Sequence, residues 1–115
     1  MEIKETIHND IAILELSGKM MGGPETHHIH EQVKALIGRG ILQVVIDLGP
    51  LQWLNSAGMG VLIASLMSVR NAGGYLVIAN AGEKVYELLQ MTHLHLVFQK
   101  YDSVEKAIEG LGKLK

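Results

Sequence analysis

The sequence predicts an α/β fold in which a mixed β-sheet of four to five strands is packed with about four α-helices. Two observations support this prediction. Short runs of consecutive apolar residues bounded by turn residues are typical of buried strands, and the segments between them repeat apolar residues at helical spacing. After an opening hairpin, strands and helices alternate, which is the order of a parallel or mixed sheet covered by helices. The length of 115 residues suits a single domain spanning residues 1–115.

The beginning of the chain predicts a hairpin followed by a helix. Residues 3–8 alternate loosely between apolar and polar, Asn9-Asp10 is a turn signal, and residues 11–16 form a second apolar run. Residues 18–24 are predicted as a loop, and Pro24 suits the first turn of a helix, where its missing N–H has no consequence. The apolar stripe of that helix and the glycines that end it are Ile29, Val33, Leu36 and Ile37, then Gly38 and Gly40.

The rest of the chain predicts alternating strands and helices by the same criteria. In order, these are a buried strand over 42–48, a helix over 57–71, a strand over 75–79, a helix over 83–91, a strand over 96–98, and a final helix from 104 that follows an N-cap at Asp102-Ser103. The residues expected to face inward from these helices are Leu62, Leu66 and Val69, then Val85, Leu88 and Leu89, then Val104, Ala107, Ile108 and Leu111.

Composition argues against several classes of function. The net charge is −2 and no basic run exceeds one residue, so the concentrated basic footprint of a nucleic-acid-binding protein is missing. The longest weakly polar run, residues 57–67, falls well short of the roughly 20 residues of a membrane-spanning helix. The charged N-terminus does not resemble a signal peptide, and the chain has no cysteine. These features predict a soluble cytoplasmic protein that contacts neither membrane nor nucleic acid.

A single hydroxyl stands at the junction between a predicted strand and the helix over 57–71. Ser56, in the stretch WLNSAGMGVL, resembles the nucleophile elbow Gly-x-Ser-x-Gly, but the residue two positions before it is Leu54. A serine hydrolase is therefore not expected. A hydroxyl just before a helix also suits an N-cap, a role that Asn55 could share or take over. The residues alone leave open whether Ser56 is a cap or a site of modification.

The glycines that follow Ser56 do not form a nucleotide-binding loop. Gly58 and Gly60 match the first two glycines of a dinucleotide fingerprint, but the third would fall on Ile63. The phosphate-binding signature that ends in Gly-Lys-Ser/Thr is also missing. We interpret both glycines as allowing the helix to begin close against the sheet, and we expect neither a cofactor nor enzymatic activity.

Three histidines lie near the start of the first predicted helix, but their pattern does not match a metal site. His27 and His30 are three residues apart and would share a helix face with His28 nearby. Zinc usually takes four protein ligands, or three and a water molecule. No cysteine is available, and His-Glu-x-x-His fails because position 34 is Lys34. We expect a solvated helical turn without metal.

The chain as a whole resembles the STAS domain family, which includes anti-sigma factor antagonists and the cytoplasmic domains of sulfate transporters. The resemblance covers nearly the whole chain. It is carried by VVIDLGPLQWLNSAGMGVLIASLMSVRNAGGYLVIAN and by the segments EKVYELLQMTHLHLVF and YDSVEKAI. The family pattern is a strand ending in Asp-Leu, a short apolar stretch, Asp-Ser-Ser/Thr-Gly-Leu-Gly, a helix, Gly-Gly and another strand.

The resemblance implies a regulatory protein that binds an anti-sigma factor which is also a serine kinase. In this family the kinase phosphorylates the serine after the motif Asp, and a phosphatase reverses the modification. By position that serine is Ser56, while the motif Asp is Asn55 and the second hydroxyl residue is Ala57. The family also has a Gly-x-Leu-Asp loop. The corresponding residues here are Gly18-Lys19-Met20-Met21-Gly22-Gly23, which contain no acid. The implied partner-binding residues are Met20, Met21, Gly22, Gly23, Asn55, Ser56, Ala57, Gly58 and Met59.

Two alternatives stand beside the phosphorylated antagonist: a STAS adaptor, and an enzyme or nucleotide-binding module, against which the incomplete motifs argue. The departures at Asn55 and Ala57 are compatible with a STAS adaptor that is not phosphorylated, for example the small subunit of a lipid-transport ABC system. The methionines Met20, Met21 and Met59 suit an adaptable docking surface and ordinary core filling equally well.

Folding is expected to be independent of metal, because the histidines lack a full ligand set and the chain has no cysteine. Thermal unfolding of protein purified without a histidine tag, with and without EDTA, measures this. The two melting temperatures should agree, and a large fall in EDTA would contradict the expectation.

Overall fold

The computed structural model describes residues 1–114 and contains a mixed sheet, four α-helices and one short 3₁₀ helix. The strands are β1 (Glu2–His8), β2 (Ile11–Met20), β3 (Gln43–Asp47), β4 (Leu51–Leu54), β5 (Tyr75–Ala79) and β6 (Lys100–Tyr101). The helices are α1 (Gly23–Gly38), α2 (Ser56–Asn71), α3 (Glu83–Met91), the 3₁₀ helix η1 (Leu94–Leu96) and α4 (Val104–Lys113).

Strand β2 is the element on which the sheet is organised. It pairs antiparallel with β1 through the predicted hairpin, and its first half pairs in parallel with β3. Its second half pairs in parallel with β4, with a register shift between Gly18 and Lys19. Strands β5 and β6 extend the sheet beyond β3 in parallel, giving the order β1-β2-β3-β5-β6 with β4 beside β2. The predicted mixed sheet is confirmed, with six strands in place of four or five.

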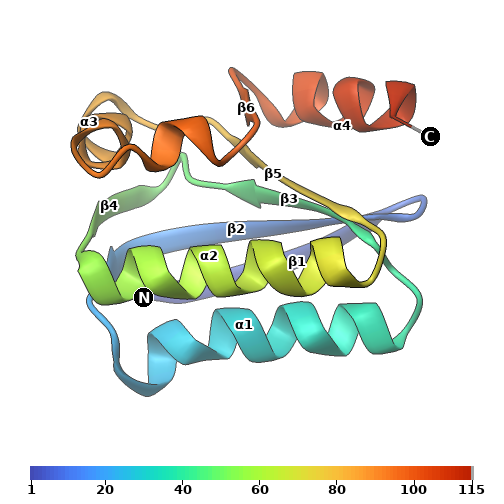
Figure 1. Cartoon of the computed structure of the whole chain (residues 1–115), viewed down its shortest axis with the longest axis horizontal. Helices are drawn as coiled ribbons and strands as arrows, with labels where there is room; N and C mark the ends of the chain where they lie inside the picture. Colours follow the sequence, from blue (N-terminus) through green and yellow to red (C-terminus); the bar gives the residue numbers. More distant parts are fainter. Residues whose placement is uncertain (115) are drawn as a thin grey trace.

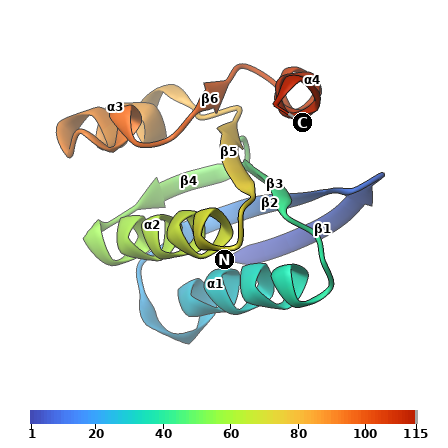
Figure 2. The same ribbon diagram turned by 45° about the vertical axis from the view of Figure 1, so that its right-hand side comes forward.

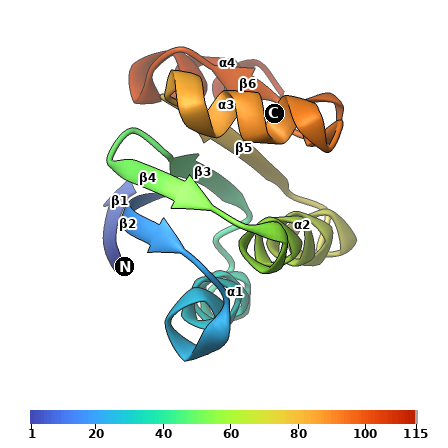
Figure 3. The same cartoon turned by 90° about the vertical axis from the view of Figure 1, so that its left-hand side faces the viewer.

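Helices cover both faces of the sheet. Helices α1 and α2 lie side by side beneath it, and α3 and α4 lie above it (Figure 1), an arrangement that the two rotated views also show (Figures 2 and 3). The larger apolar core joins β2, β3 and β5 to α1 and α2, and a smaller one lies beneath α4. No helix within residues 1–114 has both the length and the apolar character needed to cross a membrane.

Most of the predicted helices begin and end where their sequence signals indicate. Pro24 stands at the start of α1, and Gly40 follows its end with a φ of 81°. Helix α4 is capped by Ser103, whose hydroxyl accepts a hydrogen bond from the backbone N–H of Lys106 at 3.1 Å. Of the predicted inward-facing residues, Leu62, Leu66, Val69, Val85, Leu89, Ala107 and Leu111 are buried, whereas Leu88, Val104 and Ile108 are partly buried.

Two predictions about strands were wrong. The apolar run at residues 96–98 is not a strand, because His93 adopts a left-handed conformation with a φ of 61° and turns the chain into η1. Only Phe98 of that run is buried, and the last strand is β6. The second error is the end of β2, which runs four residues past its predicted end because β4 supplies a pairing partner there. Strand β4, which lies just before Ser56, had no predicted bounds because its four residues are too few to show a pattern.

The small core beneath α4 generates a prediction about stability. Leu111 is fully buried there, together with Val45 and Val77 of the sheet. Leu111→Ala should lower the free energy of unfolding by about 2–5 kcal/mol, the usual range for a buried leucine. Urea denaturation measures this, with Leu114→Ala at an exposed position as the control. Equal midpoints for the two variants would show that α4 contributes little to the fold.

Candidate functional site

The predicted serine lies on the surface, at the start of α2. Ser56 is exposed, and within residues 1–114 its hydroxyl has no hydrogen-bond partner. The N-cap is Asn55, whose side-chain Oδ1 accepts a hydrogen bond from the backbone N–H of Gly58 at 2.9 Å. The sequence left the N-cap open between Ser56 and Asn55, and in the structure it is Asn55. The Ser56 hydroxyl remains available for other chemistry.

The loop between β2 and α1 lies directly beside this helix start. The backbone N–H of Asn55 donates to the carbonyl oxygen of Met20 at 3.0 Å, and its side-chain Nδ2 donates to that of Met21 at 3.0 Å. Gly22 and Gly23 both have positive φ values, 90° and 80°, that few other residues tolerate. Two segments more than 30 residues apart in sequence thus form one continuous surface.

Gly58 permits this close approach, whereas Gly60 does not take part in it. A Cβ atom at Gly58 would lie 2.6 Å from the carbonyl oxygen of Met20 and 2.8 Å from its Cβ. Gly60 is exposed, and a Cβ there would meet nothing within 4 Å. The interpretation that both glycines seat the helix is therefore confirmed for Gly58 and wrong for Gly60.

The three methionines of the predicted site divide between core and surface. Met20 is completely buried and Met59 is 7% exposed, so both fill the core beneath the site. Met21 is 53% exposed on the loop. The structure adds Met91, which is 73% exposed at the end of α3 and was not singled out in the sequence. Its neighbour Thr92 donates a hydrogen bond to the Met59 sulfur at 3.5 Å, which places the end of α3 against the start of α2.

The surface around Ser56 carries no ionisable side chain in the segments that build it. Residues 20–24 and 55–60 read MMGGP and NSAGMG. Charged residues flank these segments: Lys19 and Glu25 stand on either side of residues 20–24, and the Lys84 ammonium of α3 lies 5.3 Å from the centre of the Trp53 ring on β4. A new negative charge on this surface would therefore contrast sharply with its surroundings.

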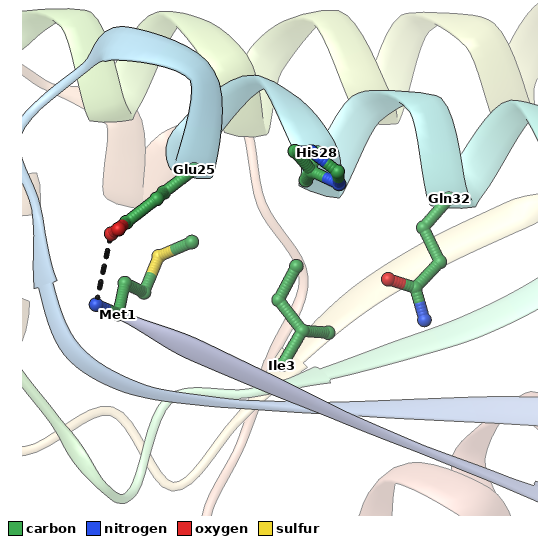
Figure 4. Close-up of a pocket in the computed structure, with 5 residues that line it drawn as sticks. All are labelled: Met1, Ile3, Glu25, His28 and Gln32. Carbon is green, nitrogen blue, oxygen red and sulfur yellow. Dashed lines mark hydrogen bonds and ion pairs between the residues drawn. The ribbon is translucent and has the colours of Figure 1, made fainter.

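The three histidines of α1 diverge from one another. The His30 ring hydrogen-bonds the hydroxyl of Ser68 on α2 at 2.8 Å, and burial, followed by the nearby charges of Lys34 and His27, lowers its pKa. His28 lines a cavity of about 330 Å³ between β1 and α1, with Met1, Ile3, Glu25 and Gln32 (Figure 4). Among residues 1–114 no three His, Cys, Asp or Glu side chains are grouped so as to hold a metal ion.

The fold and this surface together define a class of protein. It is a small mixed α/β protein with an exposed serine hydroxyl at a helix N-terminus, on a surface built from segments that carry no ionisable side chain. Comparison with known proteins gives the family. The model of the STAS domain matches residues 2–107, and the chain belongs to that family.

Named relatives and solved structures share both the fold and its extent. An anti-sigma F factor antagonist of Paenibacillus polymyxa is 25% identical, over 96% of this chain and 95% of its own. The crystal structure of a candidate anti-sigma factor antagonist from Thermotoga maritima superposes with a TM-score of 0.84 at 23% identity, covering 95% of this chain and 93% of the other. The phosphorylated form of the Bacillus cell fate determinant SpoIIAA superposes with a TM-score of 0.72 at 14% identity, covering 94% and 97%.

The contrast between the two glycines of α2 yields a matched pair of variants. Gly58→Ala should destabilise the protein, because its methyl group would force the helix away from Met20. Gly60→Ala should stabilise it by up to about 1 kcal/mol, because an exposed helical glycine is replaced by the best helix former. Ser56→Ala should have a small effect, since Asn55 provides the cap.

Chemical denaturation of the three variants measures these differences. If Gly58→Ala were as stable as Gly60→Ala, the start of α2 would not be tightly seated on β2.

Proposed function

We propose that this chain is an anti-sigma factor antagonist that binds an anti-sigma factor with serine kinase activity and is switched by reversible phosphorylation of Ser56. The observation that carries the proposal is the position of Ser56, exposed and without a hydrogen-bond partner in the described chain, within segments that carry no ionisable side chain. Membership of the STAS family and the names of the relatives support the partner class. A cognate phosphatase completes the cycle.

The local geometry explains how the fold would accept a phosphate. A phosphoserine carries about −1.5 to −2 charge at neutral pH. The beginning of a helix offers unpaired N–H groups and a partial positive charge, which favour an anion there. Ser56 is the first residue of α2, so its phosphate needs no rearrangement of the core.

The same phosphate would disturb a partner. An uncharged interface that closes over Ser56 would have to desolvate a dianion or exclude it, and an unpaired buried charge is strongly unfavourable. A penalty of only about 2.7 kcal/mol reduces affinity roughly a hundredfold. Electrostatics at one residue is therefore a sufficient switch.

The residues proposed to contact the partner are those that the structure exposes. Met21, Gly22, Gly23, Asn55, Ser56 and Ala57 form the continuous surface described above, and the exposed Met91 precedes Thr92, which bonds Met59 of α2. Met20, Gly58 and Met59 support this surface from below and contact the partner only indirectly. Exposed methionine suits such a surface because its flexible side chain adapts to the partner.

The proposal includes the remaining properties expected from the sequence. The chain acts as one STAS domain in the cytoplasm, without an enzymatic activity, a cofactor or a metal of its own. It contacts neither membrane nor nucleic acid directly, and its effect on transcription passes through the anti-sigma factor.

A STAS adaptor that is never phosphorylated is the second candidate. It is favoured by one observation, which is that Asn55 and Ala57 stand where the family pattern has an acid and a second hydroxyl. Such an adaptor, for example in a lipid-transport ABC system, would use the same exposed surface constitutively.

Substitution of Ser56 separates the two candidates. Ser56→Asp should weaken binding of the anti-sigma factor, though less than phosphate does, because Asp carries one charge where phosphate carries nearly two. Ser56→Ala should bind normally and resist phosphorylation. Both should fold, because an acid is favourable at a helix N-terminus and the cap belongs to Asn55.

The measurement is capture from an extract of the source organism on the immobilised protein, with ATP, followed by mass spectrometry of bound proteins and of phosphate position. Ser103→Asp is the matched control, because it places the same charge at the N-cap of α4. Phosphate on another residue, or a bound kinase that leaves Ser56 unmodified, would favour the adaptor.

A further inference from the structure

The side chain of Asn55 joins two segments that no other side-chain hydrogen bond joins within residues 1–114. Its Oδ1 accepts from the backbone N–H of Gly58, and its Nδ2 donates to the carbonyl oxygen of Met21 at 3.0 Å. The first bond caps α2, and the second holds the loop between β2 and α1. One planar amide makes both bonds, so they fix its orientation together.

The far side of the loop is held independently by α1. The buried hydroxyl of Thr26 accepts from the backbone N–H of Gly22 and donates to the carbonyl oxygen of Gly22, each at 3.0 Å. The position of a Cβ at Gly22 lies 3.0 Å from the methyl group of Ala57, so the loop rests on the helix start. The Asn55 amide is thus the polar side-chain link from the loop to α2, while Thr26 is its link to α1.

Only an amide has the donor and the acceptor that these two bonds require. An aspartate at position 55 would still accept from Gly58 N–H, but it would direct a second negatively charged oxygen at the carbonyl oxygen of Met21. A serine would still cap the helix but has no second arm for the loop. The asparagine that departs from the family pattern is therefore the residue suited to this particular loop.

We propose that Asn55 is a positioning residue that latches the loop to α2, and that a phosphate on Ser56 opens the latch. This inference rests on the proposed phosphorylation of Ser56. The phosphate stands at the residue next to Asn55 and competes with Oδ1 for the N–H of Gly58. Its charged oxygens form stronger hydrogen bonds than a neutral amide, and the helix dipole favours them further. Once Oδ1 loses its donor, the amide is free to turn, and the bond to Met21 is lost with it.

Phosphorylation would therefore change the surface that the partner contacts in two ways. Phosphorylation adds charge at Ser56 and also releases the exposed Met21 from its fixed place beside that residue. A partner that recognises the unphosphorylated surface therefore loses both a neutral contact and an ordered loop.

Amide hydrogen exchange measured by NMR tests the latch without any partner or kinase. The reporter is the backbone N–H of residue 55, which donates to the carbonyl oxygen of Met20 at the base of the loop. Asn55→Asp and Asn55→Ser should each lower its protection factor about tenfold, equivalent to a hydrogen bond of about 1.4 kcal/mol. The opposite substitution at the N-cap of α4, Ser103→Asn, is the control. It should leave the protection factor of the residue 55 N–H unchanged.

The second arm uses protein with phosphoserine incorporated at position 56 during synthesis. The side-chain amide protons of Asn55 should exchange about tenfold faster than in the unmodified protein. Protection within about twofold of wild type in both Asn55 variants would overturn the latch. Unchanged Asn55 side-chain exchange in the phosphorylated protein would overturn its opening by phosphate. Because no kinase is involved, a failure to find phosphate on Ser56 in cells would count against the proposed function alone.

Discussion

The contact between the end of β2 and the beginning of α2 is the constraint on which the arrangement of this protein depends. The backbone N–H of Asn55 donates to the carbonyl oxygen of Met20, and Gly58 leaves no room for a side chain between helix and strand. Strand β2 is also the strand that pairs with β1, β3 and β4. The packing of α2 on β2 therefore determines the arrangement of the larger core and also places Ser56 at the edge of the sheet.

The same contact accounts for the small and apolar residues beneath the surface around Ser56. Close approach of two backbones requires small residues and buried apolar support, which Gly58, Met20 and Met59 provide. An ionisable side chain at these buried positions would be unfavourable, because a charge held between packed backbones is desolvated. A neutral surface at a helix N-terminus is one that a single phosphate changes strongly, so the packing and the proposed regulation share a physical cause.

The departure from the family pattern at position 55 has a local explanation in this molecule. An acid there would repel the carbonyl oxygen of Met21, whereas the amide donates a hydrogen bond to it. The loop contains two glycines with positive φ, and a Cβ at Gly22 would lie 3.0 Å from the methyl group of Ala57. Asn55, Ala57 and the loop are thus mutually adjusted, and they are better understood as one unit than as separate losses.

The sequence by itself determined the fold class, the helices and the candidate serine, because these follow from local periodicity, capping residues and a motif of contiguous residues. It also identified Gly58 as a point of close packing. It did not determine that β4 exists or that residues 96–98 leave the sheet, because pairing with β2 and the left-handed turn at His93 are settled by distant parts of the chain. Nor did it distinguish Met20 and Met59 from Met21, since burial depends on which elements meet above each side chain. Only the tertiary structure brought Met21 against Asn55 and Thr92 against Met59, because hydrogen bonds between residues more than 30 positions apart leave no trace in local sequence patterns. The sequence left the cap open between Asn55 and Ser56 because both side chains are suited to it, and the structure gives it to Asn55.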